Sequence, residues 1–252
     1  MRKFGLIGYP LGHSFSKKYF TEKFLTERID DCSYENYPME NLDNFMKLIE
    51  VEEYLCGLNI TIPYKSEIIR FLDHTDTEAE EIGAVNVIKI NRHHHQLKLS
   101  GYNSDITGIK DTLLPYMRDN VRNALVLGTG GSSRAVCYVL RKFGLEVSLV
   151  SRNRKPGVLS YSEIDNSILG RTQLIVNTTP LGMFPDIESK PGINYRELTP
   201  DHILFDLVYN PELTAFLKMG AERGCSVIRG IKMLHSQAEK SWEIWNNDNS
   251  EL

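Results

Sequence analysis

One short segment limits the fold more than any other part of the chain. Residues 124–135 read ALVLGTGGSSRA, an apolar run followed by glycines and then by a helical pattern. Glycines allow a strand to turn sharply into a helix, and they let backbone N–H groups approach a pyrophosphate. The start of the helix adds N–H donors and a favourable dipole. The segment therefore predicts a dinucleotide site rather than a plain turn, built from Gly128, Thr129, Gly130, Gly131 and Ser132.

Short apolar runs alternate with helical patterns along the rest of the chain. We predict strands over residues 4–7, 32–37, 55–60, 84–90, 96–99, 124–127, 147–150, 174–176 and 203–207. We predict helices over residues 17–28, 42–49, 106–117, 132–143 and 231–245, and a further helix that begins at Pro63. Such alternation is typical of an α/β fold with a mainly parallel sheet.

The glycine segment lies in the second of two such series, which predicts two domains with a cleft between them. We expect residues 102–229 to form a Rossmann-type domain that binds a dinucleotide. Residues 1–101 and 230–252 would form a substrate-binding and catalytic α/β domain. The last helix is amphipathic, and we expect it to cross back onto the first domain.

Composition excludes several classes of function. The chain has 252 residues, 41% of them hydrophobic, and a net charge of -4, so no basic excess favours nucleic acid. No apolar run approaches the ~18 residues of a membrane span. The four cysteines are scattered, without a CxxC pair, which favours a reduced, cytoplasmic compartment and no metal site. His93, His94 and His95 fall in a predicted hairpin turn, where an exposed polar turn is expected rather than a metal site.

The coenzyme is indicated by the residues that follow the strand at 147–150. In NAD sites an acidic residue near this point holds the ribose 2′-hydroxyl. Here the strand runs into Ser151, Arg152, Asn153, Arg154 and Lys155, which include no carboxylate. Guanidinium groups grip a 2′-phosphate with paired hydrogen bonds, whereas a carboxylate would repel it. The segment favours NADP, and the alternative is a solvated basic loop.

Three segments before residue 110 carry more polar side chains than a core needs. They contain Ser14 and Ser16, then Thr61 and Lys65, then Asn86 and Asp105. Two hydroxyls spaced by one residue can both donate to a carboxylate, although a serine also caps helices well. A single lysine is ordinarily a surface charge, and Asp105 could equally cap the next helix.

Taken together, the motifs resemble those of the shikimate dehydrogenase family. They are Ser-x-Ser at 14–16, Asn-x-Thr-x-Pro-x-Lys at 59–65, Ile-Gly-Ala-Val-Asn at 82–86, Asn-Ser-Asp at 103–105 and Gly-x-Gly-Gly-x-x-Arg at 128–134. Later matches are Asn-Thr-Thr-Pro-Leu-Gly-Met at 177–183, Asp-Leu-Val-Tyr-Asn-Pro at 206–211 and Gly-Ile-Lys-Met-Leu-His-Ser-Gln-Ala at 230–238. The match runs in order from about residue 5 to 245.

The resemblance implies reversible reduction of 3-dehydroshikimate to shikimate with NADPH, a step of aromatic amino acid and chorismate biosynthesis, by a monomer or homodimer. It implies that Lys65 and Asp105 are the acid/base pair. It implies that Ser14, Ser16 and Tyr209 hold the carboxylate, and that Thr61, Asn86, Asp105 and Gln237 bind ring hydroxyls. The coenzyme would contact residues 128–132, Ser151, Arg152, Asn153, Arg154, Leu207 and Gly230.

Ketone reduction supports the role of the lysine independently. Hydride transfer to a ketone creates an alkoxide, which an ammonium group can stabilise and protonate. A nearby carboxylate would orient that ammonium group and favour its charged form.

The sequence departs from the family pattern at three places. Lys17-Lys18-Tyr19-Phe20 replaces a Pro and a His-Asn pair, Val87 replaces a Thr, and Pro156 replaces the second arginine of the phosphate loop. Arg154 or Lys155 could substitute for that arginine. The alternatives are a broader quinate/shikimate enzyme that uses NAD, a noncatalytic NADP-binding module, and a methylenetetrahydrofolate dehydrogenase-like protein.

Overall fold

A computed structural model describes residues 1–11, 15–93, 96–153 and 155–247. Ser14, His94, His95 and Arg154 therefore lie outside the described residues. The chain divides into two compact units, Met1–Ser104 with Ala238–Leu252, and Asp105–Gln237. The functional boundaries after residues 101 and 229 remain predictions.

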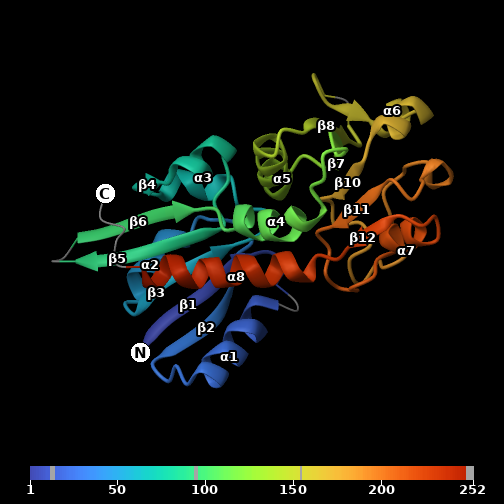
Figure 1. Cartoon of the computed structure of the whole chain (residues 1–252). Helices are drawn as coiled ribbons and strands as arrows, with labels where there is room; N and C mark the ends of the chain where they lie inside the picture. The colour runs from blue at the N-terminus through green and yellow to red at the C-terminus, as the bar shows by residue number, and fades with distance from the viewer. Residues whose placement is uncertain (12–14, 94–95, 154, 248–252) are drawn as a thin grey trace. The chain divides into compact units, whose positions relative to one another are not determined.

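The first unit contains a six-stranded sheet in the order β2-β1-β3-β5-β6-β4 (Figure 1). Its strands are β1 (Arg2–Gly8), β2 (Cys32–Pro38), β3 (Leu55–Ile60), β4 (His74–Thr75), β5 (Val87–His93) and β6 (Gln96–Tyr102). Strand β1 pairs in parallel with β2 and β3, and β4 pairs in parallel with β6. Strand β5 pairs antiparallel with both β3 and β6. The described strands therefore form a mainly parallel sheet, as predicted, which is mixed because β5 runs against its neighbours.

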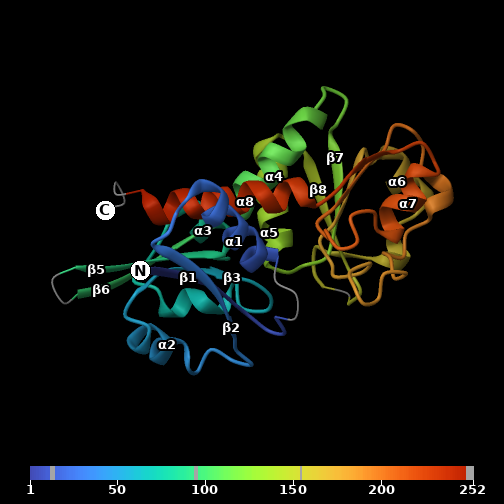
Figure 2. The same cartoon turned by 90° about the horizontal axis from the view of Figure 1, so that it is seen from below.

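Both faces of the first sheet are covered within this unit. Its helices are α1 (Phe15–Glu27), α2 (Phe45–Val51), α3 (Thr77–Ile82), the 3-10 helix η1 (Glu67–Phe71) and the C-terminal part of α8 (Ile231–Asn246). Helices α2, α3 and η1 pack on one face with residues such as Phe45, Ile68 and Ala79. Helices α1 and α8 pack on the other face, and Figure 2 shows α2 and α8 on opposite sides of the sheet.

Pro63 is not the first residue of a helix, so that prediction was wrong. It lies in a turn in which the Tyr64 N–H donates to the Thr61 carbonyl oxygen over 3.0 Å. The Tyr64 hydroxyl also donates to the Met39 carbonyl oxygen over 2.6 Å, which holds this turn against the β2 side of the unit. The following 3-10 helix begins only at Glu67.

An aromatic cluster joins α1 and α8 to the sheet. The rings of Phe4 and Trp245 stack with centroids 4.8 Å apart, and those of Phe20 and Tyr34 stack at 4.6 Å. The indole N–H of Trp245 donates to the Ile88 carbonyl oxygen over 3.0 Å. A buried indole of this kind contributes a large apolar area and also satisfies its own polar group.

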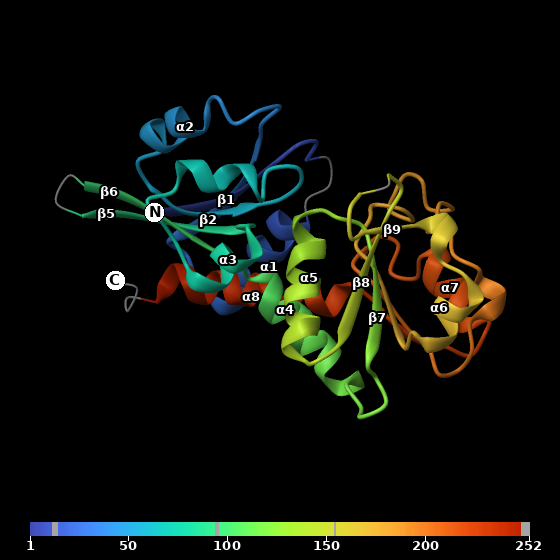
Figure 3. The same ribbon diagram turned by 90° about the horizontal axis from the view of Figure 1, so that it is seen from above.

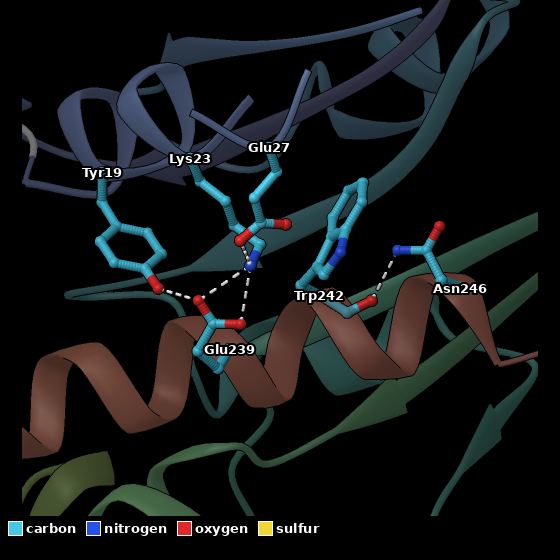
Figure 4. A network of polar contacts seen from close by, with 6 residues as sticks. All are labelled: Tyr19, Lys23, Glu27, Glu239, Trp242 and Asn246. Carbon is cyan, nitrogen blue, oxygen red and sulfur yellow. Dashed lines mark hydrogen bonds and ion pairs between the residues drawn. The ribbon is translucent and has the colours of Figure 1, made fainter. Parts of the chain in front are cut away.

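A polar network reinforces the contact between α1 and α8 (Figure 4). Lys23 Nζ lies 2.7 Å from Glu27 Oε1 and 2.9 Å from Glu239 Oε2, and the Lys23 side chain is 8% exposed. The Tyr19 hydroxyl donates to Glu239 Oε1 as well. Burial, together with this carboxylate, raises the pKa of Tyr19, so the hydroxyl keeps its proton. Helix α1 is thus tied to α8 by charge as well as by ring packing.

The second unit contains a parallel sheet in the order β12-β11-β10-β7-β8-β9. Its strands are β7 (Asn123–Leu127), β8 (Glu146–Ser151), β9 (Leu159–Ser160), β10 (Leu174–Asn177), β11 (Ile203–Asp206) and β12 (Ser226–Ile228). All five strand pairs are parallel. This Rossmann-like sheet and the two-sheet α/β class agree with the fold predicted from the sequence.

Helices cover both faces of the second sheet. They are α4 (Asp105–Leu113), α5 (Gly131–Lys142), α6 (Asn166–Arg171) and α7 (Ala215–Ala221), with 3-10 turns η2 (Leu114–Tyr116), η3 (Tyr161–Glu163) and η4 (Tyr195–Glu197). Figure 3 shows α4 and α5 on one side of the sheet, and α6 and α7 on the other. The predicted helix over 106–117 stops being α-helical at Leu113, because Pro115 has no N–H to continue it. Within the described residues, no helix combines the length and apolar character needed to cross a bilayer.

Two glycines provide a matched test of the packing around Trp245. A Cβ atom at Gly57 would overlap with Trp245 Nε1, whereas nothing lies within 4 Å of a Cβ atom at Gly170 in α6. We expect Gly57→Ala to lower the free energy of unfolding by about 1–3 kcal/mol through overpacking. Gly170→Ala should leave it unchanged or raise it by up to about 1 kcal/mol. Urea unfolding measures both values, and equal losses in the two variants would contradict this account.

Candidate functional site

The glycine loop that follows β7 adopts a backbone that only glycine suits. Gly128 has a φ of +117°, in the left-handed region. Its N–H donates to the Val150 carbonyl oxygen over 2.8 Å, and its own carbonyl oxygen accepts from Ser133 Oγ over 2.7 Å. A Cβ atom at this position would lie 2.5 Å from Thr178 Oγ1. The turn is therefore hydrogen-bonded to β8 and to α5, and the loop after β10 packs closely against it.

The start of α5 offers backbone donors to an anion. Gly130 is the N-cap residue, and no side chain caps the helix there. Nothing lies within 4 Å of a Cβ atom at Gly130, so the backbone is open to close approach. A helix N-terminus with an open glycine backbone fits a pyrophosphate.

The basic segment after β8 lies beside this loop. Val150 pairs with Leu127 of β7, which brings Ser151 next to the glycine turn. Lys155 Nζ lies 3.4 Å from Thr129 Oγ1, and Arg152 and Asn153 are exposed. The structure thus brings the two predicted coenzyme segments together within the second unit.

A buried polar network supports the loops after β10 and β11. Asn177 and Asp206 are both fully buried, and Asn177 Nδ2 donates to Asp206 Oδ1 over 3.0 Å. Asn177 Oδ1 accepts from the Thr179 hydroxyl over 2.6 Å. Asp206 accepts from the Thr214 hydroxyl over 2.6 Å and from the Val208 N–H over 3.0 Å. The two strand ends and the loops that leave them therefore form one connected unit.

The backbones of Leu207 and Gly230 lie close together beside this network. The Leu207 N–H donates to the Asn177 carbonyl oxygen over 3.0 Å. A Cβ atom at Gly230 would lie 2.7 Å from the Leu207 carbonyl oxygen, so a larger residue would displace this backbone. Tyr209 is half-buried on the same loop.

Three predicted substrate residues gather in the first unit, at the carboxyl ends of β1 and β3. The Thr61 N–H donates to the Ile7 carbonyl oxygen over 2.9 Å. The Val85 N–H donates to the Lys65 carbonyl oxygen over 2.6 Å, and the Ile60 N–H donates to the Asn86 carbonyl oxygen over 2.9 Å. The bonds of Lys65 and Asn86 thus join the segment at 59–65 to the segment at 82–86, and the bond of Thr61 joins the first of these segments to β1.

Asp105 and Gln237 lie on neighbouring helices of the second unit. Asp105 is the first residue of α4 and is 1% exposed. A Cβ atom at Gly108 would lie 2.5 Å from the Met233 carbonyl oxygen and 3.3 Å from Gln237 Cβ, so α4 and α8 cross closely there. Asp105 shares that face of α4 because it is three residues before Gly108. Convergence of Asp105 with Lys65, which belongs to the first unit, stays a prediction.

Comparison with known proteins places this chain in a family. Residues 6–88 match the model of the shikimate dehydrogenase substrate binding domain. The chain is 38% identical over 260 residues to the shikimate dehydrogenase (NADP(+)) of Clostridium beijerinckii, with 97% of this chain and 92% of that protein covered. It is 35% identical over 264 residues to that of Methanococcus aeolicus, with 96% and 90% covered. The chain belongs to the shikimate dehydrogenase family.

A solved structure of a family member agrees in fold along nearly the whole chain. The shikimate 5-dehydrogenase of Thermus thermophilus, in complex with NADP(H) and shikimate, has a TM-score of 0.83 at 29% identity. The match covers 98% of this chain and 94% of that one. The resemblance inferred from the motifs is therefore confirmed.

The departure from the family pattern after Ser16 has a structural role in this member. Lys17 Nζ lies 2.6 Å from Glu35 Oε2, and Tyr19 bonds to Glu239 as described above. Phe20 is fully buried in the aromatic cluster. The replaced residues thus attach α1 to β2 and α8.

Several polar residues of both units were given no role from the sequence. They are Tyr34, Asn59, Ser104 and Ser241 in the first unit, and Asn177, Asp206 and Thr214 in the second. Four of them lie within the family motifs quoted above, which was a usable signal: Asn59, Ser104, Asn177 and Asp206. Ser241 lies in no such motif, and the sequence showed only that a serine occupies the apolar face of the last helix.

The buried carboxyl group of Asp206 generates a pH-dependent prediction. Burial raises its pKa from 3.8 to about 7, against the opposing effect of its hydrogen bonds. The folded state then binds this proton more tightly, so its stabilising contribution is lost as the pH rises from about 4 to 7. Relative to Asp206→Asn, the free energy of unfolding of the natural chain should fall by up to about 1.4 kcal/mol per pH unit in this window. Urea titrations from pH 4 to 8 measure the difference, and a constant difference would be contrary to this assignment.

Proposed function

We propose that this protein catalyses the reversible reduction of 3-dehydroshikimate to shikimate with NADPH, a step toward aromatic amino acids. The gathering of Thr61, Lys65 and Asn86 within a matched substrate binding domain carries this proposal. Curated relatives at 35–38% identity are named shikimate dehydrogenase (NADP(+)). The first unit would bind the substrate, and the second would bind the coenzyme.

The substrate is a ring acid with hydroxyl groups. One group of predicted residues would therefore bind its carboxylate, and another would bind its ring hydroxyls. Ser14, Ser16 and Tyr209 would hold its carboxylate through hydroxyl donors. Thr61, Asn86, Asp105 and Gln237 would bind the ring hydroxyls. A site built to pair with hydroxyls rejects analogues that lack them, because its buried polar groups would then lose their partners.

Lys65 and Asp105 would perform the proton transfer. When bound, the coenzyme supplies the hydride. The Lys65 ammonium group would stabilise the negative charge that develops on the ketone oxygen and would donate a proton to it. The Asp105 carboxylate would orient the ammonium group and favour its charged form.

The coenzyme preference would come from the segment after β8. Residues 128–132 and the start of α5 would bind the pyrophosphate, which the open backbone at Gly130 supports. Arg152, with Ser151, Asn153 and Arg154 or Lys155, would hold the 2′-phosphate. Leu207 and Gly230 would contact the nicotinamide with their backbone.

Removal of the Lys65 ammonium group tests the catalytic assignment. Lys65→Ala should lower kcat about 10²–10⁴-fold, the usual contribution of a general acid, with little change in stability. Lys47→Ala, an exposed lysine on α2, is the matched control and should keep normal kcat. Turnover is followed at the nicotinamide absorbance with shikimate or quinate as substrate. Near-normal kcat in Lys65→Ala would remove Lys65 from the mechanism, whereas no turnover by the natural chain would favour a noncatalytic NADP-binding module.

Reversal of the charge at residue 152 tests the coenzyme assignment. Arg152→Asp should raise the KM for NADP+ about 10–100-fold, because charged hydrogen bonds to the phosphate are lost and a repulsion is added. The KM for NAD+ should change little. Arg223→Asp, at an exposed position after α7, makes the same charge change away from the loop and should alter neither value. An unchanged ratio of the two KM values in Arg152→Asp would show that another group selects the coenzyme.

A further inference from the structure

A chain of polar side chains, most of them buried, crosses the first unit and leads to Asn86. The Tyr34 hydroxyl on β2 donates to Asn59 Oδ1 on β3 over 2.8 Å. Asn59 Nδ2 donates to Ser241 Oγ on α8 over 3.0 Å. Ser241 Oγ lies 3.1 Å from Ser104 Oγ, which follows β6. Four separate elements thus contribute to one hydrogen-bonded chain.

The chain ends on Asn86, a predicted ligand of a ring hydroxyl. The Ser104 N–H donates to Asn86 Oδ1 over 2.7 Å, and Asn86 Nδ2 donates to Ser104 Oγ over 3.1 Å. Both ends of the Asn86 amide are therefore bound to one residue. This pair of bonds fixes the plane of the amide and, with it, the direction of its second N–H.

Ser241 Oγ is the point at which the two parts of the chain meet. Ser104 Oγ accepts from Asn86 Nδ2, and its own proton goes either to Ser241 Oγ or to Asn86 Oδ1, which lies 3.3 Å away. Because Asn59 Oδ1 accepts from Tyr34, the Nδ2 group of Asn59 faces Ser241. Ser241 Oγ thus accepts from Asn59 and shares a hydrogen bond with Ser104. Loss of this one oxygen would remove a partner from both residues and would disturb both asparagine amides.

Packing alone gives no reason for a hydroxyl at residue 241. Ser241 is 1% exposed and lies on the face of α8 that also buries Ala238 and Trp245. An apolar side chain is the usual occupant of such a position, since a buried polar group must be fully hydrogen-bonded to be tolerated. A fully bonded polar network does, however, hold its members in a single geometry.

We propose that Ser104 and Ser241 are positioning residues for the ring acid: they fix the amide of Asn86 in the orientation that binds a ring hydroxyl. This inference rests on the proposed function. It assigns to α8 a part in substrate affinity through a residue that need not touch the substrate.

The proposal is tested with variants that remove a hydroxyl group and with one variant that keeps it. Ser241→Ala and Ser104→Ala should each raise the KM for shikimate about 3–10-fold, in line with the loss of about 1 kcal/mol of hydrogen bonding. Their kcat should change less than this KM, and the KM for NADP+ should stay the same. Ser104→Thr keeps the hydroxyl, so it should keep the natural KM.

The matched control removes a buried hydroxyl elsewhere. Thr172 is 5% exposed and its Oγ1 donates to the Ile168 carbonyl oxygen over 2.8 Å in the second unit. Thr172→Val should lower thermal stability about as much as Ser104→Ala or Ser241→Ala does, and it should leave the KM for shikimate unchanged. Because Ser104 and Ser241 act through one chain, the double alanine variant should raise this KM by less than the product of the two single effects.

The outcomes separate this inference from the proposed function. An inactive natural chain that also fails to bind shikimate in calorimetry would overturn the proposed function itself. With an active natural chain, an unchanged KM for shikimate in the alanine variants would overturn only the positioning role. A parallel rise in both KM values, or no recovery in Ser104→Thr, would also overturn it. If Ser241→Ala does not fold, the comparison of Ser104→Ala with Ser104→Thr decides alone.

Discussion

Parallel strand pairing is the constraint on which the rest of this structure depends. Parallel neighbours end at the same edge of a sheet, so residues that follow different strands meet there. In the second unit this edge collects Gly128, Ser151, Asn177 and Asp206, which end or follow four adjacent strands. In the first unit the parallel pair β1 and β3 brings Thr61 beside the end of β1. The candidate residues come together because of topology, not because they are close in sequence.

Buried polar groups then fix the loops that leave these edges. Asn177 and Asp206 tie the ends of β10 and β11 to the loops that follow. Asn59 and Ser104 do the same between the first sheet and α8. An apolar core tolerates small shifts, but a buried amide or carboxyl group that loses its partner costs about 1–3 kcal/mol. These groups therefore determine the geometry of the candidate site more sharply than apolar packing does.

Helix α8 shows how one element serves both stability and the site. Its Trp245 stacks on Phe4, and its Glu239 binds Tyr19 and Lys23 of α1 (Figure 4). Its Ser241 is a member of the hydrogen-bonded chain that ends on Asn86. Two of the residues that depart from the family pattern take part in the attachment of α1, because Tyr19 bonds to Glu239 and Phe20 packs in the aromatic cluster. The family fold is thus retained although these residues of α1 differ from the family pattern.

The sequence by itself determined the glycine turn, most strands of both sheets, the basic segment after β8 and the family. These features depend on a few consecutive residues, through backbone freedom, apolar period and charge. Only the tertiary structure decided that the first sheet is mixed, that Pro63 begins no helix, and that Ser241 reaches Asn59 and Ser104. Those two contacts join residues 182 and 137 positions apart. They depend on how α8 packs on the sheet, and no local pattern encodes the distance between two side chains that far apart in the chain.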